Sequence, residues 1–393
     1  MTGALAGDGP VVVVGGGVVG LCTADYLAAA GLPVEIVERR GLGSGASRGN
    51  AGWICLSHST PVPAPGVVRY ALRSLGRPDS PLYLRPLPDP AFVRWLWRFW
   101  RSSTPAAFRR GYAAIAELNR TTFDLFDGLR AAGVATTLTR PGMVHAFLSP
   151  AEARHHLALQ REMADGRYLV PDDVVTGDEA RLLDPALSPA VRASYLVEGE
   201  GAVDPEAFAR GLGEIPCTAV VIAAGMRSAP LLNELGSRLP LQAGKGYSFS
   251  VDLEPAPRHT LYFGERRAVA SPIGGTTRIG GTMELSGNNN RLDWRRVVAV
   301  ALASRHYLGR WFDDPDDLVS LIRDPWVGGR PFLPDGLPVI DRVPGHANAF
   351  AATGHGMLGV TLGPASGHRL TEYVLTGRRP ASLAPFRFDR LRH

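Results

Sequence analysis

Cysteine is scarce in this chain of 393 residues, which contains only Cys22, Cys55 and Cys217. These residues form no CxxC pair and no cluster with histidine, so the sequence indicates neither a disulfide framework nor a metal site. The first residues lack the basic stretch of a signal peptide, and no apolar run is long enough to cross a bilayer. We therefore expect a protein of the reducing cytoplasm.

Long blocks of one charge are also missing. The chain has 42 Lys and Arg residues against 37 Asp and Glu residues, which gives a net charge of only +5. This balance does not indicate a nucleic-acid partner. A hydrophobic content of 45% and a charged content of 20% are typical of a globular protein, and the length is sufficient for two domains.

A dinucleotide-binding pattern occupies the start of the sequence. Residues 11–14 form a β-branched run that is typical of a strand buried on both faces. A GxGxxG motif fills residues 15–20, helix formers fill 21–30, and a second apolar stretch at 34–37 ends in Glu38. All these parts follow one another in the expected order, so the pattern is more specific than a lone GxGxxG motif and predicts a dinucleotide site.

The glycines and the acid of this pattern have separate tasks. Gly15 allows a tight turn, Gly17 lets the backbone approach a pyrophosphate, and Gly20 lets helix and strand pack closely. The helix N-terminus attracts the phosphate charge. Glu38 is placed to accept hydrogen bonds from ribose hydroxyls, which disfavours the 2′-phosphate of NADP. Three neighbouring residues are further candidate cofactor contacts: Val18, Val19 and Arg39.

The next stretch, GSGASRGNAGWI at residues 43–54, favours FAD over NAD. In a simple NAD dehydrogenase the second strand usually leads into another crossover helix. Here a glycine-rich segment follows, whose free backbone N–H groups can follow an extended ligand. An NAD-linked dehydrogenase stays as the alternative.

Four motifs follow in one order along most of the chain. They are VVVVGGGVVG (11–20) with Glu38, ASRGNAGWI (46–54) with PVPAPGV (61–67), CTAVVIAAGM (217–226), and WVGGRPFLPDG (326–336) through ATGHGMLGVTLGPASG (352–367). Together they resemble the FAD-dependent D-amino acid oxidase superfamily, particularly D-amino acid dehydrogenase and glycine oxidase. The resemblance implies an α/β fold, in which a Rossmann-like FAD-binding domain joins a second, α+β substrate domain built on an antiparallel sheet.

The resemblance also implies which residues contact the cofactor. Those expected near the pyrophosphate and isoalloxazine are Ser47, Arg48, Asn50, Ala51 and Gly52, and those after a strand beside the cofactor are Ala224 and Gly225. Those expected near the flavin pyrimidine are Gly354, His355, Gly356, Met357, Leu358 and Gly359. A helix is predicted from Met357 to a closing Gly377, with its N-terminus towards the flavin. Of two roles for His355, packing is favoured over catalysis.

Arg330 is the candidate for substrate binding. In the resembled enzymes the arginine at this motif binds the substrate carboxylate, and a guanidinium matches a carboxylate bidentately. The alternative is a structural ion pair with an internal acid such as Asp335 or Asp341. Tyr247 could line the pocket or hydrogen-bond the carboxylate, and the equally favoured alternative is a strand tyrosine packed in the core.

Three departures from the family pattern shape the expectations. Glycine oxidases carry a tyrosine where this chain has Val269, which removes one carboxylate partner and favours a substrate bulkier than glycine, or an N-substituted one. Sarcosine oxidases attach FAD through a cysteine near the position of Arg330. This chain has none after Cys217, so non-covalent FAD is expected. Around Glu214–Cys217 a few dozen family residues are missing, either through a true deletion or because the printed sequence omits them, and the omission is favoured.

The predicted domains are discontinuous. Residues 8–65, 203–236 and 324–393 are assigned to the FAD-binding domain, and 66–202 and 237–323 to the substrate domain. Within the latter, one helical face carries an apolar stripe formed by Phe92, Trp95, Leu96, Phe99 and Trp100. We expect this stripe to pack within the domain, and peripheral membrane contact is a less favoured alternative.

The sequence therefore predicts an FAD-dependent enzyme that oxidises the C–N bond of an amino acid. The alternative is an oxidase of an N-substituted glycine or another secondary amine. Its expected partners are a small amino acid or amine and an electron acceptor, which is either O2 or a quinone or electron carrier.

Overall fold

The predicted dinucleotide motif forms part of the smaller of two main sheets. The computed structural model describes residues 10–73, 80–84, 89–134, 137–164, 168–211, 219–309 and 318–391. Within them, five strands pair in the order β15–β16–β9–β1–β2. Their bounds are Val11–Val14 (β1), Val34–Val37 (β2), Val220–Ile222 (β9), Val339–Arg342 (β15) and Ala349–Thr353 (β16). The pairs β2–β1, β1–β9 and β9–β16 are parallel, and β15 is antiparallel to β16.

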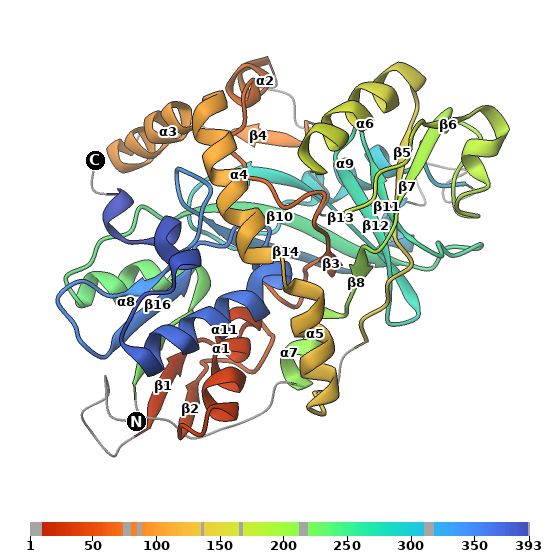
Figure 1. Cartoon of the computed structure of the whole chain (residues 1–393). Coiled ribbons are helices and arrows are strands. Elements are labelled where there is room, and N and C mark those ends of the chain that lie inside the picture. Colours follow the sequence, from red (N-terminus) through yellow and green to blue (C-terminus); the bar gives the residue numbers. More distant parts are fainter. Residues whose placement is uncertain are drawn as a thin grey trace.

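Two buried helices pack closely against each other beside this sheet. They are α1 (Val18–Ala29) and α11 (Gly359–Thr376), seen with β1 and β2 at the bottom of Figure 1. Small residues permit the approach, because a Cβ on Gly367 would lie 2.7 Å from the backbone of Cys22. The helix predicted to close at Gly377 is confirmed, since Gly377 caps α11 in the left-handed region with a φ of 67°.

The larger sheet contains nine strands among the described residues. Eight pair in the order β14–β10–β13–β12–β11–β5–β7–β6, and β4 pairs with β13. Their bounds are Leu82–Leu84 (β4), Met143–Phe147 (β5), Val175–Thr176 (β6), Ala193–Val197 (β7), Gln242–Val251 (β10), Thr260–Phe263 (β11), Ala268–Ile273 (β12), Thr276–Leu285 (β13) and Arg323–Phe332 (β14). The consecutive pairs from β14 to β11 are antiparallel, as the sequence predicts, whereas β5 is parallel to β11 and β4 is parallel to β13. A short ribbon, β3 (Trp53–Ile54) with β8 (Gly201–Ala202), is separate from both sheets.

The remaining helices connect and cover the two sheets. They are α2 (Val67–Arg73), α3 (Pro90–Ser102), α4 (Pro105–Asn119), α5 (Thr122–Ala131), α6 (Pro150–Ala164), α7 (Pro205–Gly211), α8 (Ser228–Glu234), α9 (Trp294–Ser304) and α10 (Leu318–Leu321). The mixed architecture confirms the predicted α/β fold with a second, largely antiparallel sheet. The predicted domain bounds stay a prediction, although β14, which they assign to the FAD-binding part, pairs with β10 in the larger sheet.

The apolar stripe of α3 packs into the interior. Phe92 and Trp95 are buried in one cluster with Leu285 of β13 and Phe332 of β14. Trp100 was expected to share this face, but 58% of it is exposed. One side of α3 therefore covers the end of the larger sheet, as the favoured interpretation of the stripe predicts.

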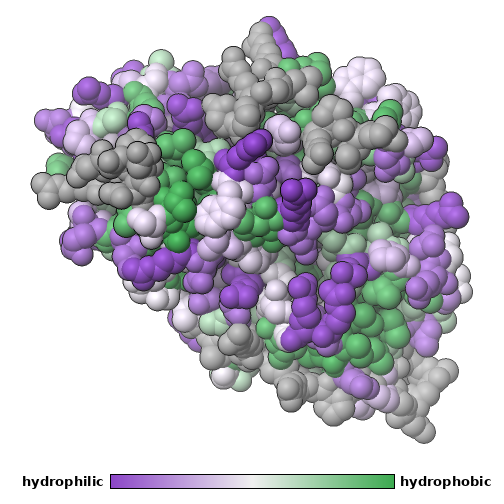
Figure 2. Space-filling model, turned by 180° about the vertical axis from the view of Figure 1, so that it is seen from behind, coloured by the Kyte–Doolittle hydropathy of each residue, from purple (hydrophilic) through white to green (hydrophobic). Residues whose placement is uncertain are grey.

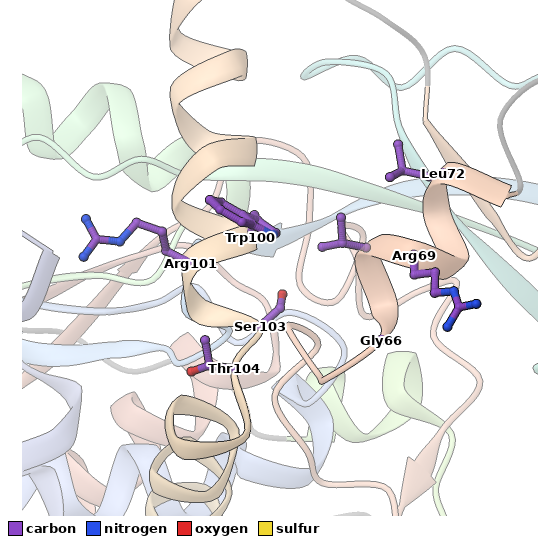
Figure 3. A pocket seen from close by; sticks show the side chains of 8 residues that line it. Gly66, Arg69, Leu72, Trp100, Arg101, Ser103 and Thr104 are labelled. Carbon is purple, nitrogen blue, oxygen red and sulfur yellow. The ribbon is translucent and has the colours of Figure 1, made fainter.

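The described surface carries several hydrophobic patches among polar residues, as the view from behind shows (Figure 2). A pocket of about 660 Å³ lies between α2 and the end of α3, with Leu72 on one side and Trp100 on the other (Figure 3). None of the candidate site residues lines it. Among the described helices, none combines the length and hydropathy that a membrane span requires.

The tight contact at Gly20 yields a test of the fold. A Cβ there would lie 2.1 Å from the backbone oxygen of Gly15, so Gly20→Ala is expected to destabilise the protein by about 1–3 kcal/mol. The free energy of unfolding from urea titration measures this effect. Gly45→Ala is the matched control, because a Cβ at Gly45 meets no atom within 4 Å. Equal stabilities of the two variants would contradict the packing described here.

Candidate active site

The carboxyl ends of the four parallel strands meet at one edge of the smaller sheet. The segments that follow these strands contain most of the predicted cofactor contacts: the glycine turn after β1, Glu38 after β2, Ala224 and Gly225 after β9, and Gly354 after β16. In open α/β sheets, ligands bind at this edge. The fold therefore brings together residues that are more than 300 positions apart in the sequence.

The glycine turn and Glu38 are in contact. Oε2 of Glu38 accepts a hydrogen bond from the backbone N–H of Gly16 at 2.9 Å, which fixes the acid beside the turn. A Cβ on Gly17 would meet only Oγ of Ser47, at 3.6 Å, so the space in front of Gly17 is open. Ser47 itself accepts from the N–H of Val18 in the first turn of α1. An open glycine at a helix N-terminus, beside an acid, fits a dinucleotide.

The segment that contains Ser47 forms a fixed loop. The side-chain oxygen of Asn50 accepts from the N–H of Gly52 at 2.8 Å. Gly52 has a φ of 75°, and a Cβ there would lie 2.1 Å from the backbone oxygen of Val203, so only glycine fits. Arg48 is exposed, with its Nε 3.8 Å from a carboxylate oxygen of Glu206. The loop is therefore held by its own hydrogen bond and by contact with Val203, and its one cation, Arg48, lies in solvent.

The last predicted segment lies where β16 leads into α11. The backbone N–H of Gly356 donates to the carbonyl of Pro331, which joins this turn to the end of β14. His355 is buried, and its Nε2 is hydrogen-bonded to Oγ of Ser366 at 2.9 Å. Burial lowers the pKa of His355 to about 3, so the ring is neutral at physiological pH. These contacts agree with a packing role for His355.

The other candidate contacts differ in exposure. Val18 and Leu358 are buried, Val19 is half-buried, Met357 is 43% exposed and Arg39 is exposed. The cofactor roles of all these residues stay predictions.

Arg330 projects from β14 over the neighbouring strand. It lies opposite Gly244 of β10 in the antiparallel register, and a Cβ on Gly246 would lie 2.1 Å from its Nη2. Its Nη1 donates to the backbone oxygen of Thr282 at 2.8 Å. Absence of a side chain at Gly246 thus makes room for the guanidinium group.

The acids proposed as alternative partners of Arg330 are paired with other arginines. Asp335 binds Nε of Arg390 at 2.7 Å, and Asp341 binds Nη2 of Arg379 at 2.8 Å. Across the described ranges, no ion pair of Arg330 with a carboxylate is present. Burial lowers the pKa of Arg330 to about 10, so it keeps its charge at neutral pH. It is a half-buried cation available to an anionic ligand.

A β-bulge shapes the strand beside Arg330. Between β10 and β13, Lys245 pairs with Glu284 and Tyr247 pairs with Gly281, so Thr282 and Met283 both face one residue of β10. Thr282 has a φ of 63°, which is unusual for a β-branched residue. The bulge exposes the Thr282 carbonyl, which accepts the hydrogen bond from Nη1 of Arg330. Bulges are frequent next to active sites. The sequence gives no signal for this bulge except its glycine-rich surroundings.

Tyr247 lies on the opposite face of the larger sheet from Arg330. Successive residues of a strand alternate between faces, and Gly244 and Gly246 share the face of Arg330. Tyr247 is only 1% exposed, and its hydroxyl donates to Oε2 of Glu284 at 2.7 Å. The structure therefore corresponds to the core alternative, and Tyr247 is omitted from the proposed substrate contacts.

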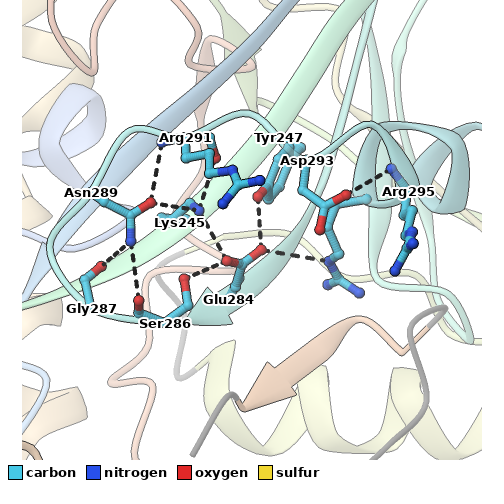
Figure 4. A network of polar contacts seen from close by, with 10 residues as sticks. Lys245, Tyr247, Glu284, Ser286, Gly287, Asn289, Arg291, Asp293 and Arg295 are labelled. Atoms are coloured by element: carbon cyan, nitrogen blue, oxygen red, sulfur yellow. Dashed lines mark hydrogen bonds and ion pairs between the residues drawn. The ribbon is translucent and has the colours of Figure 1, made fainter. Parts of the chain in front are cut away.

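Glu284 is the centre of a buried polar network on that opposite face (Figure 4). It accepts from Nζ of Lys245 at 2.9 Å, from the Tyr247 hydroxyl and from Ser286, and Nε of Arg296 lies 3.9 Å away. Burial alone would raise the pKa of Glu284, but these hydrogen bonds bring it below its ordinary value. The network joins β10 to β13 directly beside the bulge, so it fixes the register that presents Thr282 to Arg330.

Known proteins resemble this chain over nearly its whole length. A family profile described as FAD dependent oxidoreductase matches residues 10–215 and 211–373. The two matches meet where family residues were expected to be missing, and residues 212–218 lie outside the described part of the structure. A D-amino acid dehydrogenase from Rhizorhabdus wittichii is 33% identical over an alignment of 413 positions, gaps included, which covers 94% of this chain and 97% of the relative.

Solved structures share the fold at low sequence identity. Glycine oxidase from Geobacillus kaustophilus aligns with a TM-score of 0.70 and 22% identity, covering 97% of this chain and 98% of that one. L-proline dehydrogenase from P. horikoshii aligns with a TM-score of 0.69 and 18% identity, covering 98% and 99% respectively.

The open space at Gly17 predicts a variant that separates cofactor binding from folding. Gly17→Ala is tolerated by its surroundings, so unfolding of the flavin-free protein should change by no more than about 0.5 kcal/mol. The added methyl group occupies the expected pyrophosphate position, so the FAD content of the purified protein, read from its absorbance, should fall. Full FAD content would exclude a close approach of the pyrophosphate at Gly17.

The buried network predicts a large loss of stability on Glu284→Gln. The substitution leaves Lys245 without its buried counter-ion, which costs about 3–5 kcal/mol in the free energy of unfolding. Glu372→Gln is the control, because Glu372 pairs with Arg369 at the surface, where such a pair contributes about 0–1 kcal/mol. Equal effects of the two variants in urea unfolding would show that the network does not hold the strands.

Proposed function

The chain belongs to the family of FAD-dependent oxidoreductases, and we propose that it oxidises the C–N bond of an amino acid whose carboxylate Arg330 binds. One observation supports this most directly. The guanidinium of Arg330 is partly withdrawn from water, is held by the carbonyl of Thr282, and has no ion pair with a carboxylate among the described residues. A carboxylate ligand would supply the missing charge.

The chain contributes binding and orientation to this reaction. When bound, FAD supplies the hydride acceptor. Arg330 fixes the carboxylate and thereby the direction of the neighbouring Cα–H bond, which is a form of catalysis by positioning. Partial desolvation favours the neutral amine that hydride loss requires, and the imine product hydrolyses in water. No side-chain base is needed, which agrees with His355, whose lowered pKa of about 3 makes it a weak proton acceptor and whose Nε2 is hydrogen-bonded to Ser366.

The substrate we propose is a D-amino acid, since the relative that covers most of the chain at 33% identity carries that activity in its name. An N-substituted glycine or another secondary amine is the alternative. Val269 favours either of them over free glycine, because it is half-buried on the strand next to the bulged strand β13 and is smaller than a tyrosine.

The electron acceptor and the cellular location stay open predictions. O2 and a quinone or electron carrier are the proposed acceptors. Peripheral membrane contact is the less favoured arrangement, although Val93, Trp97 and Trp100 are exposed on the outer side of α3. The expected cytoplasmic location is likewise a prediction.

An anaerobic screen tests the proposed function. Purified protein is mixed without oxygen with D-amino acids, glycine, proline analogues and N-alkyl glycines, and flavin absorbance is followed. Bleaching by a D-amino acid is the expected result, and bleaching by none of these compounds would refute the proposal. Admission of oxygen then separates an oxidase, which forms peroxide, from a dehydrogenase.

The role of Arg330 predicts a specific kinetic defect. Arg330→Lys keeps a positive charge but loses the bidentate fork, so KM for the carboxylate substrate should rise about 10- to 100-fold while FAD stays bound. Arg323→Lys on the same strand is the control, because Arg323 is exposed and pairs with Asp252. An unchanged KM in Arg330→Lys would remove Arg330 from the substrate site.

A further inference from the structure

Two aromatic residues lie on either side of Arg330 along β14. Successive residues of a strand alternate between its faces, so one face of β14 carries four residues in turn: Trp326, Gly328, Arg330 and Phe332. Trp326 is half-buried, and Phe332 is only 4% exposed. Neither ring is among the predicted site residues, although both share the face of the residue that is proposed to bind the carboxylate.

The indole of Trp326 lies against two glycines. A Cβ on Gly328, the next residue of this face, would lie 1.9 Å from Cη2 of the ring. A Cβ on Gly49 would lie 1.9 Å from Cδ2 of the same ring. For both glycines, the three nearest atoms all belong to this indole. Glycine inside a strand often marks the close approach of another group, and here the missing side chains give the ring its place.

Gly49 lies within the motif ASRGNAGWI (46–54), which is predicted to line the cofactor. Oγ of Ser248 on β10 donates to the backbone oxygen of Gly49 at 2.9 Å. Ser248 lies directly opposite Trp326 in the register of β10 and β14. The predicted cofactor loop is therefore attached to the larger sheet at one residue, by a hydrogen bond from one strand and by the indole from the next.

Phe332 makes the corresponding contact with the other predicted flavin segment. A Cβ on Gly244 of β10 would lie 2.4 Å from Cε2 of its ring, and a Cβ on Gly356 would lie 2.5 Å from Cε1. Gly356 lies in the turn between β16 and α11, which is predicted to contact the flavin pyrimidine. Each of the two rings thus contacts one glycine of the larger sheet and one glycine of a cofactor segment.

These contacts connect the position of both cofactor segments to that of Arg330. Trp326 and Phe332 belong to the same strand as Arg330, and Gly246, beneath the guanidinium, pairs directly with Gly328. A displacement of β14 would therefore move the guanidinium and both contacts together. Catalysis by positioning requires such coupling, because a small misplacement of the substrate relative to the cofactor lowers the rate.

We propose that Trp326 and Phe332 are positioning residues that hold the two FAD-binding segments against the strand that carries Arg330. This inference rests on the proposed function, because it takes these segments as the cofactor site and Arg330 as the carboxylate site. Trp326 is the better residue to test. Phe332 also packs in the buried cluster with Phe92 and Trp95, so its removal would disturb the fold.

Glycine substitutions test the contact of Trp326 without changing a predicted cofactor residue. Gly49→Ala and Gly328→Ala should each raise the Kd for FAD about 10-fold, because the new methyl group displaces the indole. Titration of the flavin-free protein with FAD measures the effect. Gly281→Ala on β13 is the control, since a Cβ there comes no closer than 3.4 Å to its neighbours. An unchanged Kd in both test variants would overturn the proposal.

Removal of the indole should make the two glycine substitutions harmless. Trp326→Ala alone should raise the Kd for FAD about 10-fold, and adding Gly49→Ala or Gly328→Ala should then change it by less than about 2-fold. Trp326→Phe keeps a ring and should stay within about 3-fold of the unsubstituted protein. Trp97→Ala, on the exposed side of α3, is the control.

Effects that simply add in the double variants would overturn the proposal, because the glycines would then act without Trp326. A glycine variant that fails to fold is also informative. Trp326→Ala should restore folded protein in that background, since the nearest atoms to the new methyl group all belong to the indole. Failure of this restoration would likewise contradict the contact.

Kinetics at saturating FAD separate a positioning role from a merely structural one. Trp326→Ala should lower the limiting rate of anaerobic flavin reduction about 10-fold, while KM changes by less than about 3-fold, because Arg330 still binds the carboxylate. This pattern is the reverse of that expected for Arg330→Lys. An unchanged limiting rate would remove Trp326 from the positioning residues.

The outcomes distinguish the two proposals. If an amino acid bleaches the flavin and Arg330→Lys raises its KM, while the Trp326 variants keep their FAD affinity and reduction rate, the proposed function stands and this inference is rejected. If no amino acid bleaches the flavin but the double variants show the expected coupling in Kd, the proposed function fails and the contact between Trp326 and the cofactor loop stands.

Discussion

A cation that is partly removed from water needs a compensating charge, and Arg330 has none among the described residues. Removal of water is costly for any ion, and one carbonyl, that of Thr282, returns only part of the lost hydration. The acids nearest in sequence do not neutralise Arg330, because Asp335 and Asp341 are paired with other arginines. The fold therefore keeps this charge available, and a carboxylate ligand is the simplest group that would complete it.

The same strands hold the cation on one face and stabilise their own register on the other. Because Gly246 has no side chain, the guanidinium of Arg330 fits above β10. Its neighbours in sequence, Lys245 and Tyr247, are hydrogen-bonded to Glu284 on the opposite face of the sheet. The bulge between them turns the Thr282 carbonyl towards Arg330. Because each strand alternates its side chains, stability and binding use different residues of one segment and interfere little with each other.

The sequence predicts those features that depend on local order. The strand, glycine turn and helix of residues 11–29 follow from spacing alone, and so do Glu38 beside the turn and Gly377 at the end of α11. The environment of Tyr247 could not be predicted, because its face of the strand is set by a pairing register with residues more than 30 positions away. The bulge at Thr282 depends on the same register, and no local sequence pattern predicts it.

The two sheets separate the two requirements of such an enzyme. At the edge of the smaller sheet, contacts are made by backbone groups of glycine-rich turns, which leaves little freedom to change a residue without loss of the fit. Across the larger sheet, side chains such as Arg330 and Val269 project from strands whose backbone pairing does not depend on them. Substitutions there alter the shape and polarity of the substrate space while the register and the cofactor edge persist. A family with one fold can therefore act on different amino acids and amines by changes confined to one face of one sheet.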